Sequence, residues 1–183
     1  MVRRSIRVGV LVAAGLLSLS ASVRAYDPAA VADLKSGKKC PGCDLKGADL
    51  RGAKLTNVVL TGADLSGANL DGADGQAADL ERSDLRGSLV RRAQLAGANL
   101  QDANLKGADL SGANLDGADL KGAILEGASL RSARVQGANL TGAKLAGADL
   151  SGTIGLSQKQ LDATCGDASQ ISLPPSLTLK PCR

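Results

Sequence analysis

The chain has 183 residues, which suits one domain, and it lacks Phe, Trp and His, so its interior has to be built almost wholly from Leu and Ala. The absence of His removes the commonest general base and metal ligand, and no other residues form a persuasive catalytic centre or cofactor site. Four of the 22 basic residues but none of the 18 acidic ones lie in residues 1–25, so the rest of the chain is formally neutral and gives no support to nucleic-acid binding.

Residues 1–25 have the pattern of a cleavable signal peptide. Three arginines precede an apolar run over residues 8–19 that is too short to span a bilayer, and small residues follow up to Ala25. We expect cleavage after Ala25 by the general secretory route, giving a periplasmic or secreted protein with no membrane association afterwards. An uncleaved amphipathic start is one alternative, and a twin-arginine signal, indicated by Arg3 and Arg4, is another.

Residues 26–42 are predicted to form an N-terminal helical cap. Asp27 is a suitable N-cap, Pro28 suits the first turn, and Gly37 would follow the last residue of the helix. The sequence Cys-Pro-Gly-Cys at residues 40–43 has the spacing of a redox dithiol. We favour a staple that holds the cap on the following repeat, because no thioredoxin-like βαβ pattern surrounds the cysteines.

Residues 43–152 form a five-residue repeat without insertions. The 110 residues make 22 units, in which the third position is Leu in 19, the first is Ala in 18, the second is Asp or Asn in 14 and the fifth is Gly in 16. Neither an α-helix nor a continuous strand buries a period of five on one face. Within one unit, however, an extended segment points Ala and Leu the same way, and Gly permits a turn before the next unit. Each unit is therefore predicted to form one side of a coil in an all-β solenoid.

Some units depart from this pattern. Gly75 replaces an inward Leu and is expected to leave a void or to collapse one side of its coil. Val59, Leu89 and Ile124 occupy the outward second position, where they are isolated apolar residues. Leu89, together with Val90 beside it, forms a candidate local contact surface.

Residues 153–183 are predicted to form a C-terminal cap, since a solenoid exposes unpaired edges at its ends. Ser157 to Gln160 is a capping-box pattern that opens a second short helix, which we expect to end near Cys165. The tail beyond this helix is rich in Pro and is expected to be an extended cover.

The A-(D/N)-L-x-G units resemble those of the pentapeptide-repeat family over about 60% of the chain. The two ends, which contain CPGCDLKGADL and GLSQKQLDATCGDASQISLPPSLTLKPC, are similar to those of exported bacterial members. The resemblance implies a right-handed quadrilateral β-helix with four units per coil, and hence about five and a half coils with short helical caps. At a strand spacing of about 4.8 Å per coil, the tower would be about 25 Å tall with a solid Leu interior.

The height that the resemblance implies limits disulfide formation. Four cysteines allow three pairings, but Cys40 and Cys43 lie at the first coil whereas Cys165 and Cys182 lie beyond the last. A separation of about 25 Å exceeds the Cα distance of about 4.4–6.8 Å found in disulfides. We therefore expect the local pairs 40–43 and 165–182, which suit an oxidising compartment, and no shared zinc site.

Charged residues that are 20 positions apart would stack on such a coil. Arg51, Asp71 and Arg91 would then share one column, a charge ladder of little individual strength at a surface. The faces carry mixed charge, and columns of outward Asp are interpreted as solvated rungs rather than calcium sites. What the repeat leaves unexplained is a candidate contact surface that consists of Leu89, Arg91, Arg92 and Arg131.

These features favour an exported, non-enzymatic structural or protein-interaction scaffold with an unknown protein partner and no cofactor. Homodimerisation through an end or a face is left open. The alternative comes from the resemblance, because some pentapeptide-repeat proteins imitate DNA and inhibit or protect type II topoisomerases. That alternative implies a cytoplasmic and markedly acidic rod, which the leader and the balanced charge oppose.

Overall fold

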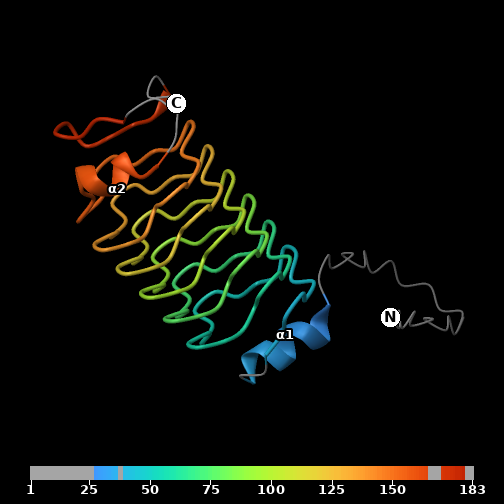
Figure 1. Ribbon diagram of the computed structural model, residues 1–183. Helices are drawn as coiled ribbons and strands as arrows, with labels where there is room; N and C mark the ends of the chain where they lie inside the picture. The colour runs from blue at the N-terminus through green and yellow to red at the C-terminus, as the bar shows by residue number, and fades with distance from the viewer. Residues whose placement is uncertain (1–26, 37–38, 165–169, 180–183) are drawn as a thin grey trace, which may run out of the picture.

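The computed structural model describes residues 27–36, 39–164 and 170–179 (Figure 1). It contains helix α1 (Pro28–Lys35), a stack of coils and helix α2 (Gln158–Asp162). The predicted signal peptide lies outside the described residues. Neither of the two described helices has the length and apolar character needed to cross a membrane.

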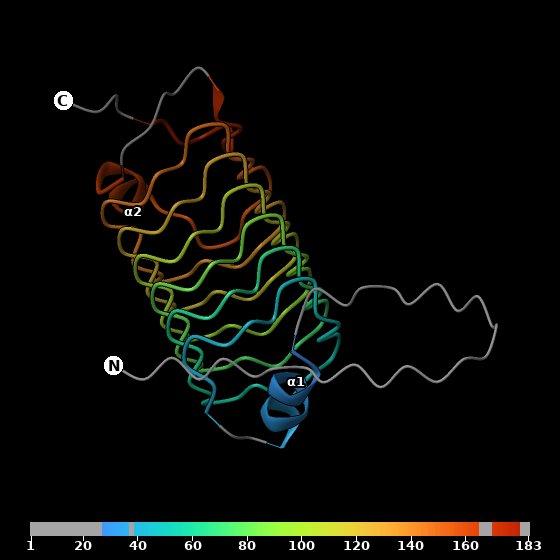
Figure 2. The ribbon, with the colours of Figure 1, turned by 90° about the vertical axis from the view of Figure 1, so that its right-hand side faces the viewer.

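The coils are held in register by isolated parallel β-bridges rather than by long strands. From Asp44↔Asp64 to Arg134↔Ile154, each bridge joins residues 20 positions apart, so that four five-residue units complete one turn. Figure 2 shows the resulting stack, with α1 at one end and α2 at the other. The predicted β-solenoid with helical ends is therefore confirmed.

The same hydrogen bonds recur from coil to coil. Leu45 N–H donates to the carbonyl of Asp64 at 2.7 Å, and Gly47 N–H donates to the carbonyl of Ser66 at 2.9 Å. In the other direction, Asp64 N–H donates to the carbonyl of Cys43 at 2.8 Å. Third-position and fifth-position N–H groups thus point toward the next coil, and second-position N–H groups point toward the previous one. This exchange pairs backbone groups that would be costly to bury alone.

The interior is filled by the first and third positions of the units. The third-position Leu side chains are 0–4% exposed, and each fully buried Leu stabilises the fold by about 1.5–3 kcal/mol. Ser83 and Ser88 replace Ala inside the solenoid, where their hydroxyl groups donate to the carbonyls of Leu80 and Leu85 at 2.7 Å. The predicted inward set is confirmed, and its two polar members are hydrogen-bonded.

The fifth position of each unit turns the chain with a left-handed backbone. All 16 Gly residues at this position have φ between 59° and 70°. The six fifth positions without Gly keep the same conformation, with φ of 53–58°; they are Asn57, Ala77, Arg82, Arg92, Asp102 and Ser132. A Cβ atom disfavours this region by about 1 kcal/mol. The hydrogen bonds between coils therefore impose the turn even where the residue type opposes it.

At Gly75, where a void or a collapse of one side of the coil is predicted, a neighbouring side chain lies close to the missing one. Leu95 lies one coil further on and places its Cδ2 atom 2.9 Å from the position that a Cβ atom on Gly75 would occupy. Gly75 N–H still donates to the carbonyl of Gln94 at 2.8 Å. The backbone therefore keeps its register at Gly75, and Leu95 occupies part of the space that a Leu side chain would take there.

Helix α1 covers the first coil. The Asp27 side chain caps it by accepting a hydrogen bond of 2.8 Å from Ala29 N–H, and the Asp27 backbone N–H donates to the carbonyl of Asp44 at 3.2 Å. Ala30 and Leu34 turn inward and are 8% and 0% exposed. The predicted helix and its N-cap are confirmed.

Helix α2 begins with the predicted capping box, which Ser157 and Gln160 form. It ends at Asp162, before the predicted end near Cys165, which lies outside the described residues. The chain leaves the helix there because the carbonyl of Ala163 accepts a hydrogen bond of 2.8 Å from Gly142 N–H of the solenoid. The residue after the end of α2 is therefore paired with the solenoid.

Candidate interaction sites

One corner of the solenoid joins three charged residues from two adjacent coils. The carboxylate of Asp71 accepts a hydrogen bond of 3.0 Å from Arg91 Nη2 and two of 2.8 Å from Arg92 Nη2. The Asp71 side chain is 14% exposed, whereas those of Arg91 and Arg92 are 43% and 72% exposed. A largely buried anion thus orients two guanidinium groups that extend into solvent.

The electrostatics of this corner follow from that geometry. The hydrogen bond from Arg92 is the main cause that holds the pKa of Asp71 below its usual value. Arg91 Nε is buried and has no hydrogen-bond partner among the described residues, although it lies 3.9 Å from an Asp109 carboxylate oxygen. Leu89 is half-buried and bridges to the coils on both sides. Leu89 is thus an outward apolar residue two positions before Arg91 in the same unit.

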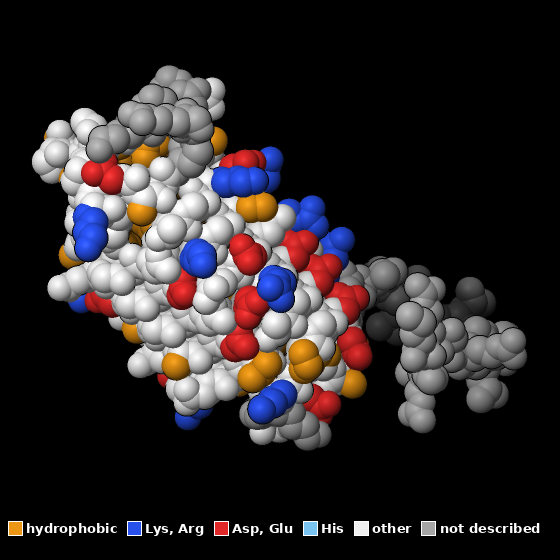
Figure 3. All heavy atoms as spheres, viewed as in Figure 1, with side chains coloured by type: hydrophobic (Ala, Val, Ile, Leu, Met, Phe, Trp, Pro, Cys, Tyr) orange, Lys and Arg blue, Asp and Glu red, His pale blue; other side chains and the backbone are white. Residues whose placement is uncertain are grey.

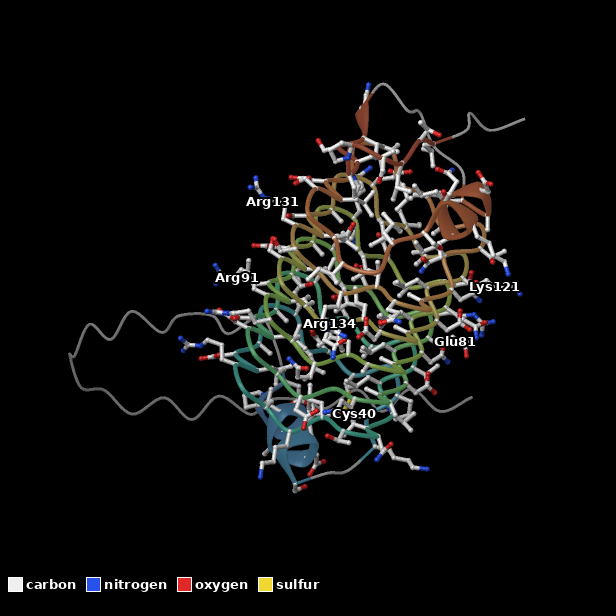
Figure 4. The ribbon with its side chains drawn as sticks, turned by 90° about the vertical axis from the view of Figure 1, so that its left-hand side faces the viewer. Cys40, Glu81, Arg91, Lys121, Arg131 and Arg134 are labelled. Carbon is white, nitrogen blue, oxygen red and sulfur yellow. A yellow bond between two sulfur atoms is a disulfide. The ribbon has the colours of Figure 1, made fainter. Side chains whose placement is uncertain are left out.

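Arg131, the fourth residue of the predicted contact surface, lies apart from the other three. It occupies the same corner as Arg91 but two coils further on, with Ser111 between them in the column. Its guanidinium is 3.8 Å from Asp149. Figure 4 shows Arg91 and Arg131 along one edge of the solenoid. The structure thus joins Arg91 and Arg92 through Asp71, has Leu89 in the same unit, and leaves Arg131 on a separate ion pair.

Ion pairs also occur elsewhere on the described coils. Arg86 pairs with Asp84, Lys106 pairs with Glu126 at 3.0 Å, and Arg134 pairs with Asp116. The hydrogen bond from Arg86 lowers the pKa of Asp84. Figure 3 shows the resulting mixture of basic and acidic side chains on one face.

On another face of the solenoid, outward Asp and Asn residues alternate along one column. Asn99 Nδ2 donates to Asp79 at 3.1 Å, and Asn139 Nδ2 donates to Asp119 at 3.0 Å. Within the described residues, no group of three or more His, Cys, Asp or Glu is placed to hold a metal ion.

The cysteines divide between the described and undescribed parts of the chain. Cys40 and Cys43 are paired through their sulfur atoms, with Cα atoms 5.5 Å apart, as expected for a disulfide. Cys40 is 7% exposed, and its N–H donates to the carbonyl of Val59 at 2.9 Å. The cysteine pair is therefore hydrogen-bonded to the first coil of the solenoid. Cys165 and Cys182 lie outside the described residues.

The C-terminal end carries a latch that the sequence did not reveal. Gln160 Nε2 donates to the carbonyls of Val135 and Ala138 at 2.8 and 2.9 Å. Gln158 Nε2 donates to the carbonyl of Thr178 at 2.8 Å, and its Oε1 accepts from Thr178 N–H at 3.2 Å. The Gln160 side chain thus hydrogen-bonds the last coil, and the Gln158 side chain hydrogen-bonds the C-terminal tail.

A groove of about 480 Å³ remains between α2 and the last side of the solenoid beneath it. The lining comes from coil residues 136–141, from residues 155 and 157, and from residues 159, 160 and 163 in and just after α2. Lys159 is its one charged lining residue.

A family model described as pentapeptide repeats matches the chain in eight copies, over residues 43–74, 53–92, 91–127 and 123–154. No curated protein matches the sequence.

Several solved structures are similar. Rfr23, a pentapeptide repeat protein from the cyanobacterium Cyanothece 51142, is 35% identical over 55% of this chain, with a TM-score of 0.45, and this chain covers 64% of its length. HetL from Nostoc sp. strain PCC 7120, which is involved in heterocyst differentiation regulation, is 28% identical over 78% of this chain and 73% of its own, also with a TM-score of 0.45. QnrB1, a plasmid-mediated fluoroquinolone resistance protein, is 24% identical over 68% of this chain and 64% of its own, with a TM-score of 0.35.

Proposed function

Because the chain belongs to the pentapeptide-repeat family, we propose that it is an exported, non-enzymatic scaffold that binds a protein partner at the corner formed by Leu89, Arg91 and Arg92. We also propose a number and a handedness for the coils. Twenty-two units at four per turn give about five and a half coils, and we propose that these coils are right-handed, as the resemblance of the units to the family implies.

The observation that carries the binding proposal is the arrangement around Asp71. Its carboxylate fixes the directions of two guanidinium groups, so their side chains lose less freedom when a partner binds. Arginine is enriched at the residues that dominate the energy of protein interfaces, and Leu89 adds an apolar contact. The partner predicted by this chemistry offers carboxylates to Arg91 and Arg92 and an apolar surface to Leu89.

A scaffold role is also supported by the carboxyl groups whose pKa values are lowered. The carboxyl groups with lowered pKa values each accept a hydrogen bond that accounts for the shift: Asp71 from Arg92, Asp84 from Arg86 and Asp149 from Ser151. Paired surface groups of this kind stabilise the solenoid and its charge pattern, and they differ from the isolated, poised groups of acid–base catalysis.

Capture with matched variants tests the binding proposal. The mature chain is cross-linked in the envelope and secreted fractions of its source cells, together with the variant R91A/R92G and the control R86A. The double variant removes the charges at the proposed corner, and the control removes a paired Arg on another face. We expect a defined adduct with the wild type and the control and none with the double variant. Equal adducts with all three proteins would refute the corner as the binding site.

The cell compartment is proposed from the signal-peptide pattern of residues 1–25 and from the Cys40–Cys43 pair, since disulfides persist in oxidising compartments. A reporter fused after Ala25 should be active outside the cytoplasm, and thiol titration of the native protein should find no free cysteine. A cytoplasmic reporter with four titratable thiols would overturn both the export proposal and the disulfide proposal.

The alternative, a DNA mimic that acts on a type II topoisomerase, calls for uncompensated negative charge. Asp44, Asp64 and Asp84 follow one another in one column and are the feature that favours it. Arg86 nevertheless neutralises the last of them. A supercoiling assay with purified topoisomerase separates the two proposals. Inhibition that the variant D44N/D64N abolishes would support the DNA mimic, whereas unchanged supercoiling agrees with the scaffold.

A further inference from the structure

The end of the solenoid beneath α2 has backbone donors that the cap leaves open. In a regular coil, Leu120 N–H donates to the carbonyl of Asn139 at 2.9 Å, and Gly117 N–H donates to the carbonyl of Gln136 at 2.8 Å. Leu140 and Gly137 stand at the corresponding positions one coil further on. Their N–H groups therefore point out of the end of the solenoid, toward the place of a coil that the sequence does not continue.

The cap satisfies the backbone groups on either side of these two. Val135 N–H donates to the carbonyl of Ile154 at 2.9 Å, and Gly142 N–H donates to that of Ala163 at 2.8 Å. The carbonyls on the same side are occupied by the Gln160 latch. For the N–H groups of residues 137 and 140, by contrast, no acceptor lies within the described part of the chain. Beneath α2, these two N–H groups are therefore donors that the described residues leave open.

Both donors belong to residues that line the groove. The groove also carries a positive charge, which, like the two N–H groups, attracts a negatively charged or electron-rich group. Lys159 carries its one charge and makes no ion pair with any described residue. The hydroxyl groups of Thr141 and Ser157 already donate to Asn139 and Gln160, at 2.7 Å each. The groove therefore presents two backbone N–H groups and an ammonium group, and its lining contains no carboxylate.

We propose that this groove binds a short extended peptide that carries a carboxylate. The carbonyl oxygens of the peptide would replace those of the missing coil and accept from Gly137 and Leu140, in the way that a strand adds to an open sheet edge. The ammonium of Lys159 would bind the carboxylate through a charge-assisted hydrogen bond. The site is separate from the Leu89–Arg91–Arg92 corner and stands whether or not that corner binds a partner.

Amide NMR on the mature chain tests the proposal with three probes. The first is acetyl-tetra-alanine with a free carboxyl terminus, the second is the same peptide with a terminal amide, and the third is acetate. We expect the free acid to shift the amide signals of Gly137 and Leu140 and to bind about tenfold more tightly than the amide. K159Q should bring the affinity for the acid down to that of the amide, whereas K159R should retain it.

Lys121 provides the matched control, since it is an exposed Lys on a lower coil. K121Q should bind the free acid like the wild type. The proposal is overturned if the acid and the amide bind equally, if acetate binds as tightly as the peptide, or if the shifted signals lie away from the groove. It is also overturned if sedimentation shows a dimer whose formation competes with the peptide, because a second copy would then be the occupant.

Discussion

Arg92 reaches back by one coil to hold Asp71, although its own backbone lies in the left-handed region. Its Nη2 donates to both carboxylate oxygens at 2.8 Å, while its φ is 56°. An Arg at a position that favours Gly thus makes the contact that lowers the pKa of Asp71.

The first prediction concerns that carboxyl group. In the variant R92A, the pKa of Asp71 should rise toward its usual value, because the hydrogen bond from Arg92 is the main cause of the shift. The wild-type pKa is lower in the folded than in the unfolded chain. The pair therefore stabilises the fold above the unfolded pKa, and its contribution is lost as the pH falls through the folded pKa.

Carboxyl NMR over an acid titration measures this change. R134A serves as the control, because Arg134 pairs with Asp116 instead. Identical titration of Asp71 in the wild type and R92A would contradict the pairing.

The second prediction concerns Ala77, which also has a left-handed backbone, with φ of 53°. A77G should stabilise the fold by about 0.5–1 kcal/mol, since it removes the Cβ atom that this conformation disfavours. A96G, at a fourth position in the next coil, should instead destabilise it by about 0.5–1 kcal/mol. Urea unfolding of both variants measures these changes in the free energy of unfolding. A loss of stability in A77G would show that the left-handed backbone of Ala77 is not strained.

The third prediction concerns Gly75. Restoring the repeat with G75L should destabilise the fold, because Leu95 already occupies the space. L95A alone should cost about 2–5 kcal/mol. In the double variant, the two changes should partly compensate, so G75L should cost less in the L95A background than in the wild type. Purely additive unfolding energies would show that the two side chains do not compete.

The fourth prediction concerns the Gln160 latch. Q160A should leave the carbonyls of Val135 and Ala138 without their side-chain donor and destabilise the end coil by about 1 kcal/mol. Hydrogen exchange should accelerate at Gly142 and its neighbours and remain unchanged in the first coil. Q76A, at an exposed fourth position, should leave exchange unchanged throughout. Uniform acceleration over the whole chain in Q160A would argue against a local latch.

Much of the fold follows from the period of five, because each unit repeats the same inward and outward positions. The buried Leu and Ser83 positions, the Asp27 cap and the Ser157 capping box all follow from local pattern. Gly75 does not, since the sequence cannot show that Leu95 of the next coil approaches the position of the missing side chain.

The candidate sites were less predictable than the coils. Stacking every 20 residues predicts the Asp71–Arg91 contact, but Arg92 occupies a corner position whose direction depends on its unusual φ. Gln160 was expected only to cap its own helix. Its bonds to the solenoid depend on where α2 lies, which no local pattern specifies.

The most direct test of the proposed scaffold function is site-specific photo-cross-linking in living cells. A photoreactive residue is placed at Leu89 in one protein and at Ile124 in another, since both are half-buried apolar residues at outward second positions. We predict one adduct of defined mass from position 89 and none from position 124. No adduct from position 89, or the same adduct from both positions, would contradict a partner bound at this corner.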